Sequence, residues 1–167
     1  MVLPFTPFHL GPGLLFGLLL FSYLDLPTFL VASVIIDVEP LLVLSLSLSY
    51  PLHGYLHTFM GGTIVAFLLA FAMSRVRGVL APLVSLFKFE QRTSFKGIVL
   101  ASLFGICFHI LLDSPLYSDI RPFYPLESNP LQNLDMFIGF GIYAFCILSF
   151  TAGGIVYAAR LIFRKKS

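Results

Sequence analysis

Two pairs of residues in this sequence have a spacing typical of metal ligands. His53 and His57 lie four positions apart, and so do His109 and Asp113. On an α-helix, residues four apart share one face, with Cβ atoms about 6 Å from each other. Each pair can therefore bind one cation or bridge two. Imidazole nitrogen and carboxylate oxygen are ligands of Zn²⁺, and they also suit Mn²⁺ or Fe.

The composition places these residues in a membrane protein. Of the 167 residues, 58% are hydrophobic and only 11% are charged, and the mean hydropathy is +0.96. Both features lie outside the range of soluble domains. Crossing a bilayer takes about 20 apolar residues. We predict an all-α integral membrane bundle of about five transmembrane helices, forming a single domain over 1–167. The predicted spans are 7–24, 27–50, 52–73, 97–113 and 136–160.

The second predicted span contains two carboxylates, Asp37 and Glu39, followed by Pro40. Proline disfavours helical backbone at the residue before it. We therefore predict that the second helix is broken near Glu39, and that its carboxylates open into an outward-facing cavity, because irregular backbone at membrane depth normally lines one. In the first span, Thr6 and Pro7 are a plausible helix start that places His9 near the outer end.

The basic residues predict an orientation. They cluster between the third and fourth spans and at the C-terminus: Arg75, Arg77, Lys88, Arg92, Lys96, Arg160, Arg164, Lys165 and Lys166. The positive-inside rule places both regions in the cytoplasm, which puts the N-terminus outside. Arg121 lies apart, among acidic residues of a predicted outer loop. No basic residue or cleavage site marks a removable signal, so residue 1 is expected to begin the mature chain.

With this orientation, seven ionisable residues are expected in the outer half of the membrane. Such groups are costly there unless they face a partner, a cavity or an ion. Taken singly, Asp37 or Glu39 can cap a helix break, His9 can be interfacial, and a lone histidine is more often packed and hydrogen-bonded. As a set they favour a metal site. The candidate ligands are His9, Asp37, Glu39, His53, His57, His109 and Asp113. They exceed the needs of one tetrahedral ion, which favours two metals.

The ordered motifs resemble a known family. The order is His9, then DVEP (37–40), HGYLHT (53–58), HILLD (109–113) and RPFYPL (121–126). It resembles the small integral-membrane, metal-dependent hydrolases of the YdjM/DUF457 type, which are regarded as distantly similar to zinc-dependent phospholipase C and P1 nuclease. The resemblance implies a hydrolase whose ligands are His9, Asp37, His53, His57, His109 and Asp113. Many relatives have Asp followed by His where this chain has Glu39-Pro40, so Glu39 is open as a ligand, a general base or a residue that supports a ligand.

The ligand chemistry agrees with hydrolysis. A bound divalent metal, most simply Zn²⁺ with Mn²⁺ as an alternative, lowers the pKa of water to near 7, and a pair about 3.5 to 4 Å apart suits attack at phosphorus. Arg121 can bind phosphate oxygens, or it can pair with Asp119 or Glu127. Thr58 and Tyr124 are further hydrogen-bond donors. We predict a cell-membrane hydrolase, with Glu39 and Arg121 as catalytic candidates, that cleaves a phospholipid or polyprenyl phosphate at a site facing the exterior.

A transporter or metal carrier is the main alternative, because ionisable clusters within membranes also mark ion pathways. The inner halves of the spans, at 14–22, 28–36, 64–73 and 97–105, contain no charged residue. A one-sided cavity favours the enzyme, with a scaffolding protein as a third possibility. Neither a glycine-rich phosphate loop nor a basic stripe for nucleic acid is present. The sequence leaves the oligomeric state open.

The remaining segments are expected to be scaffold. Residues 78–96 are either an amphipathic stretch on the cytoplasmic surface or a plain inner loop. The fifth span is expected to pack through Gly139, Gly141, Gly153 and Gly154, which allow close approach of helices. Cys107 and Cys146 are interpreted as small apolar residues inside the spans.

Overall fold

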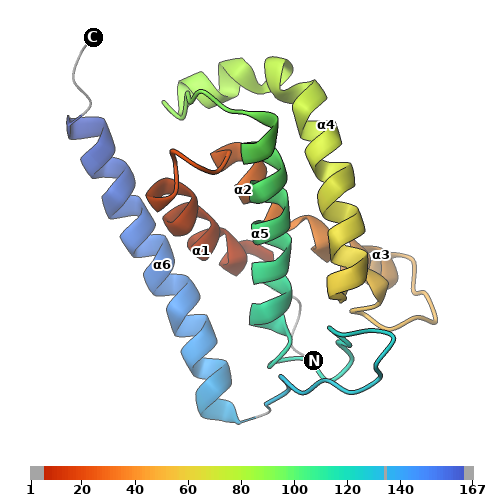
Figure 1. The fold of residues 1–167 in the computed structure, drawn as a ribbon. Coiled ribbons are helices and arrows are strands. Elements are labelled where there is room, and N and C mark those ends of the chain that lie inside the picture. The colour runs from red at the N-terminus through yellow and green to blue at the C-terminus, as the bar shows by residue number, and fades with distance from the viewer. Residues whose placement is uncertain (1–5, 134, 164–167) are drawn as a thin grey trace.

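The computed structural model describes residues 6–133 and 135–163, and this part of the chain is all-helical, as predicted (Figure 1). Its helices are α1 (Thr6–Leu19), α2 (Leu26–Ala32), the 3₁₀ turn η1 (Ile35–Asp37), α3 (Val38–Ser45), the 3₁₀ turn η2 (Tyr55–His57), α4 (Phe59–Leu86), α5 (Phe95–Asp113) and α6 (Met136–Phe163). No strand occurs among these residues.

Three helices begin at side chains that satisfy free backbone amides. The Asp25 carboxylate accepts from the Thr28 amide at 3.1 Å, the Thr58 hydroxyl from Gly61 at 2.9 Å, and the Ser94 hydroxyl from Gly97 at 3.1 Å. These residue types are strong N-caps because their oxygens accept from the first orphan amides. The starts of α2, α4 and α5 are therefore encoded locally.

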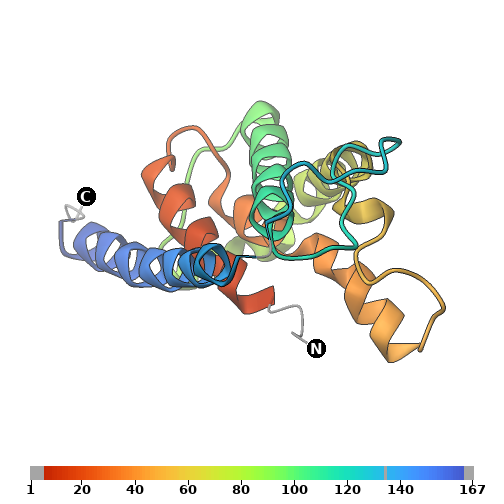
Figure 2. The same cartoon turned by 90° about the horizontal axis from the view of Figure 1, so that it is seen from below.

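The helices pack in a row in which α6 lies along α1, α1 contacts α2, and α5 lies between α2 and α4 (Figure 1). The starts of α1, α4 and α6 and the end of α5 meet at one end of the bundle, which the loop between α5 and α6 also borders. Figure 2 shows α3 projecting from the side of the row. The polar ends of several elements are thus brought together at a single end.

Four stretches are long and apolar enough to cross a membrane: Leu26–Ser45, α4, α5 and α6. They indicate a membrane protein. Helix α1 is apolar but has only 14 residues, which corresponds to about 21 Å at 1.5 Å per residue. The first predicted span, 7–24, therefore ends early, at Leu19, whereas the fourth and fifth agree closely with α5 and α6.

The third span lies further along the chain than predicted. It begins at Phe59 and reaches Leu86, instead of covering 52–73. His53 and His57 consequently precede the helix, because Thr58 has extended backbone and caps α4. The predicted surface segment 78–96 is divided, because residues up to Leu86 continue α4, which bends over the end of the bundle (Figure 1). Pro82 lies inside this helix. Proline removes a helical hydrogen bond and bends the helix.

The second span is broken as predicted, but earlier than Glu39. Helix α2 stops at Ala32, the backbone of Val34 leaves the helical region at φ −138°, and η1 carries the chain to Asp37. Glu39 and Pro40 instead lie in the first turn of α3. Proline is tolerated there because the first amides of a helix have no intrahelical acceptor.

Small residues allow close packing at two contacts. A Cβ on Gly105 would lie 2.5 Å from the Cβ of Ala32, so glycine is what lets α5 approach α2. In α6, a Cβ on Gly153 would approach Leu14 to 3.1 Å, as expected for a packing glycine. A Cβ on Gly141 or Gly154 would have no described atom within 4 Å, so these two glycines do not make the helix contact that was predicted for them.

A polar cluster joins the elements at the opposite end. The fully buried Asp25 carboxylate pairs with Arg77 of α4 and accepts from the Thr93 hydroxyl at 2.9 Å. The Gln91 amide donates to the Leu24 carbonyl at 2.7 Å and accepts from the Leu26 amide at 3.0 Å. These bonds tie the α1–α2 turn to α4 and to the linker before α5.

Replacing Arg77 with Met is expected to destabilise the protein, because it leaves the buried Asp25 carboxylate without its cation. Breaking a buried pair costs about 3–5 kcal/mol. Since Arg77 is a quarter exposed, we expect the lower part of that range, or a fall in Tm of at least about 5 °C in detergent. Arg75→Met is the matched control, because Arg75 lies over the Phe71 ring and pairs with no acidic side chain among the residues that the structure describes. Equal Tm values for the two variants would contradict the structural role of the Asp25–Arg77 pair.

Candidate metal centre

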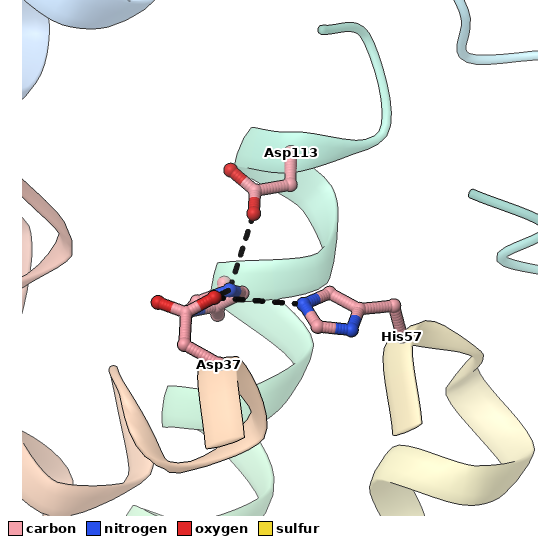
Figure 3. Close-up of side chains that lie close together, drawn as sticks. Asp37, His57 and Asp113 are labelled. Atoms are coloured by element: carbon pink, nitrogen blue, oxygen red, sulfur yellow. Dashed lines mark ion pairs between the residues drawn. The ribbon is translucent and has the colours of Figure 1, made fainter. Parts of the chain in front are cut away.

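Four buried side chains converge at the end of α5. Asp37, His57, His109 and Asp113 each offer one ligand atom, and these atoms all lie within 4.8 Å of one another. Asp37 ends η1, His57 ends η2, and the other two lie one turn apart on α5. Figure 3 shows Asp37, His57 and Asp113 pointing toward one another from three separate elements. This Asp/His/His/Asp group can hold a metal ion.

The distances within the group fit metal coordination. His109 Nε2 lies 3.3 Å from Asp37 Oδ1 and 3.2 Å from Asp113 Oδ2, and His57 Nε2 lies 3.7 Å from Asp37 Oδ1. With bonds of about 2.0–2.1 Å to Zn²⁺, the ligand atoms of a tetrahedral site are roughly 3.3–3.4 Å apart. Charge-assisted hydrogen bonds are shorter, at about 2.7–2.9 Å. The spacing of these three pairs is therefore compatible with ligands of a shared cation, within a group whose ligand atoms lie at most 4.8 Å apart.

The break between α2 and α3 orients His109. Helix α2 has ended by Ser33, and the Ser33 carbonyl accepts from His109 Nδ1 at 2.7 Å. A carbonyl can only accept, so Nδ1 carries a proton, and in the neutral ring Nε2 then presents a lone pair to the cluster. Metal-binding histidines are usually held in this way.

Glu39 orients His57. Its Oε2 lies 2.9 Å from His57 Nδ1 and accepts from the Gly54 amide at 2.9 Å, and its Oε1 accepts from the Leu56 amide at 3.2 Å. These bonds position the loop before α4 and direct His57 Nε2 toward Asp37. Glu39 thus lies behind a candidate ligand, with both oxygens occupied.

Asp119 orients His53 in the same way. Its carboxylate accepts from the His53 amide and lies 3.0 Å from His53 Nδ1. The His53 ring packs against Tyr117, with centroids 4.3 Å apart, and its centroid lies 4.7 Å from that of His57. Partial burial raises the pKa of Asp119, but the bonds from His53 outweigh this effect and leave the pKa below its ordinary value.

His9 lies on the far side of the group. Its Nε2 is 3.0 Å from Asp113 Oδ1, and its ring stacks on His109 with centroids 4.0 Å apart. The two Asp113 oxygens are therefore divided, one toward His9 and the other toward His109. His9 either orients Asp113 or binds a metal beside it.

Several buried atoms that can act as metal ligands form no hydrogen bond with any residue the structure describes. They include Nε2 of His53, His57 and His109 and both oxygens of Asp37. Unpaired buried polar atoms are rare and costly. The orphaned atoms are those that a divalent metal would bind, and three of them belong to imidazoles whose Nδ1 atoms are already anchored. This donor set fits Zn²⁺ and related cations.

The charges also favour a cation. Within the described residues, the ion pairs of Asp37, Glu39, Asp113 and Asp119 involve histidine, whereas Asp25 and Glu127 pair with arginine. Carboxylates buried in an apolar bundle need a counter-charge. This counter-charge comes either from protonated histidines or from a bound metal. The anchored Nδ1 atoms are compatible with both.

All seven sequence-predicted ligands thus lie in one region. Four form the compact group, His9 and His53 flank it, and Glu39 stands behind His57. Arg121 is half-exposed and lies 3.6 Å from Glu127. This ion pair is one of the two roles predicted for Arg121. The sequence analysis did not identify Asp119 or the Ser33 carbonyl as anchors of histidines. The signal that the sequence offered for Asp119 was its position in the loop that follows the HILLD motif.

Comparisons with protein-family models, with curated proteins and with solved structures gave no match.

Replacing His57 with Gln or Asp113 with Asn is expected to remove bound metal, because each change deletes a donor of the four-residue group. Glu39→Gln keeps all four donors but weakens the hold on His57, so metal affinity should fall about 10–100-fold. Elemental analysis and competition with a chelator measure both effects. Glu127→Gln, which neutralises an exposed carboxylate, should bind metal like the wild type. Unchanged metal content in both His57→Gln and Asp113→Asn would refute the site.

Proposed function

We propose that the chain is a membrane-embedded metal-dependent hydrolase that cleaves a phosphoester of a lipid, with one or two divalent ions, most simply Zn²⁺. The observation that carries the proposal is the set of buried Nε2 atoms and Asp37 oxygens that no described residue satisfies. The resemblance to YdjM/DUF457-type hydrolases supports the same reading. Membership in that family is part of the proposal.

The metal, when bound, would supply a Lewis acid that lowers the pKa of water and polarises a phosphoryl oxygen. Asp37, His57, His109 and Asp113 would hold it. Glu39 and the Ser33 carbonyl keep two of these imidazoles in the ligand tautomer. Since both Glu39 oxygens are occupied, the geometry supports a positioning role for Glu39 better than a role as general base.

Hydrolysis of a phosphoester needs no other co-reactant. The oxygen of water forms a bond to phosphorus, the bond from phosphorus to the alcohol oxygen breaks, and one water proton passes to the departing oxygen. The cluster lies at an end of the bundle, beside exposed apolar helices. A lipid can therefore present its phosphate without leaving the bilayer, which favours lipid phosphoesters as substrates.

The packing next to the site favours an enzyme over a carrier. Directly adjoining the cluster, Ala32, Ile36, Ala66, Ile106 and Ile110 form a fully buried apolar layer. Alternating access would require polar groups through this layer. Among the described residues, the next buried charge is Asp25 at the opposite end, which pairs with the partly exposed Arg77. A site closed on one side suits hydrolysis.

Removing the metal is expected to abolish activity. Chelator-treated protein should lose at least about 100-fold in rate on short-chain lipid phosphates, or roughly 2.7 kcal/mol in barrier height, and Zn²⁺ or Mn²⁺ should restore the rate. His109→Gln should be equally inactive and should not be rescued. Full activity of the metal-free protein would refute the mechanism. Metal or proton flux in liposomes, with no hydrolysis, would support the carrier instead.

The proposed orientation places the site outside the cell, with the basic end of the bundle in the cytoplasm. A cysteine in place of Glu127 should react with a membrane-impermeant thiol reagent on intact cells. A cysteine in place of Arg92 should react only after permeabilisation. The native Cys146 is buried and Cys107 is half-buried, both within helices that can cross a membrane, so background labelling should be low. The reverse pattern would invert the topology.

A further inference from the structure

A cavity of about 230 Å³ lies beside the candidate metal centre. It is formed by the loop before α4 and by the loop after α5. Its lining includes His53, Asp119 and Arg121, together with three tyrosines, Tyr50, Tyr55 and Tyr124. This cavity is separate from the four-residue metal group, and the two share a boundary at His53.

His53 connects the cavity to the cluster. The residue is 1% exposed, its Nδ1 is held by Asp119, and its Nε2 has no hydrogen bond with a described residue. Its ring also contacts that of His57 edge-on. His53 therefore lies between the cavity and the metal centre, and its Nε2 is buried behind the wall of the cavity.

Arg121 supplies the positive charge of the cavity. It is the single Lys or Arg of the sequence between Lys96 and Arg160. Its pairing with Glu127 spans 3.6 Å, with side chains that are 52% and 83% exposed. Exposed pairs of this kind are weak, so a phosphate can displace Glu127. The guanidinium can bind two phosphate oxygens at once.

Asp119, the other charged residue in the lining, does not cancel this preference. Both of its oxygens accept hydrogen bonds from His53, which directs its charge toward the imidazole. Three tyrosines also line the cavity: Tyr55 and Tyr124 pack edge to face with centroids 5.2 Å apart, and the Tyr50 hydroxyl accepts from the Tyr55 amide. The lining thus combines one arginine with aromatic side chains.

The size of the cavity suits a small polar group. A volume of about 230 Å³ has room for several water-sized groups at about 30 Å³ each. A phosphate with one small substituent fits this space. A single arginine matches one phosphate better than two, which favours one compact phosphate over a diphosphate.

The surroundings indicate a lipid as the source of the phosphate. Leu48, Met60, Phe123 and Leu126 are exposed, and each lies within two residues of a residue that lines the cavity. Apolar side chains at the rim of a polar cavity suit a headgroup whose chains remain in the bilayer.

From these observations we infer that the cavity binds the headgroup of a lipid carrying a single, compact phosphate, which Arg121 holds beside His53. The inference rests on the proposed function and specifies its substrate class. It ranks lipids with a single phosphate above those with a diphosphate, including lipids that carry a nucleoside diphosphate.

The test compares lipids with identical tails. In the first set, dioctanoyl phosphatidic acid and dioctanoyl phosphatidylethanolamine are compared with the dioctanoylglycerol lipid that carries cytidine diphosphate. In the second set, farnesyl phosphate is compared with farnesyl diphosphate. We expect the single-phosphate member of each set to have a kcat/KM at least 10-fold higher. Arg121→Gln should raise KM 10- to 100-fold with little change in kcat, while Glu127→Gln should leave KM unchanged or lower. Similar rates for the cytidine-diphosphate lipid, or an unchanged KM in Arg121→Gln, would overturn the inference.

Binding is also measured without turnover, which separates this inference from the proposed function. Inorganic phosphate should raise the Tm of the wild type and of Glu127→Gln, but not that of Arg121→Gln. Metal content should be equal in all three proteins, which shows that the site is folded. Phosphate binding through Arg121 without any lipid hydrolysis would refute the enzyme while supporting the cavity. Hydrolysis with an equal phosphate effect in Arg121→Gln would refute the cavity and leave the enzyme standing.

Discussion

A histidine that binds metal through Nε2 needs a fixed acceptor at Nδ1, and this fold supplies three such acceptors around one cluster. They are the Ser33 carbonyl, the Glu39 carboxylate and the Asp119 carboxylate, at 2.7, 2.9 and 3.0 Å from the imidazoles of His109, His57 and His53. Each comes from a different segment of the chain. Because each acceptor fixes both ring orientation and tautomer, the convergence of the Nε2 atoms is a property of the whole end of the bundle and not of any single motif.

The break between α2 and α3 makes this convergence feasible. A continuous helix would have bonded the Ser33 carbonyl internally and would have spread Asp37 and Glu39 around its surface. Because the helix stops, the carbonyl is available to His109. The 3₁₀ turn then directs Asp37 into the cluster, while Glu39, two residues later, reaches the loop that carries His57. The broken backbone therefore serves both the candidate ligands and their supports, which is a common reason for irregular backbone at membrane depth.

The fold could be predicted from the sequence to a useful extent, because hydropathy and span length constrain helices strongly. The site was predictable in part. His109 and Asp113 do lie one turn apart on a helix, as their spacing indicates. His53 and His57 meet for another reason, since Pro51, Gly54 and the Thr58 cap keep them in a loop and a 3₁₀ turn. The break was placed too late because proline was taken as its cause. It lies instead where the Ser33 hydroxyl bonds back to the Phe29 carbonyl and Val34 leaves the helical region.

The two polar ends of the bundle have different physical characters, and the difference bears on function. At one end, Asp25 already has Arg77, Thr28 and Thr93 as partners, so its charge is compensated within the protein. At the other end, the ionisable partners of the buried carboxylates are histidines among the described residues. The first arrangement is complete as it stands and serves to fasten helices. The second can hold a cation, and it adjoins a cavity whose arginine has a weak, exposed partner. The same apolar layer separates the two ends, so the group that can hold a cation is confined to one end of the bundle.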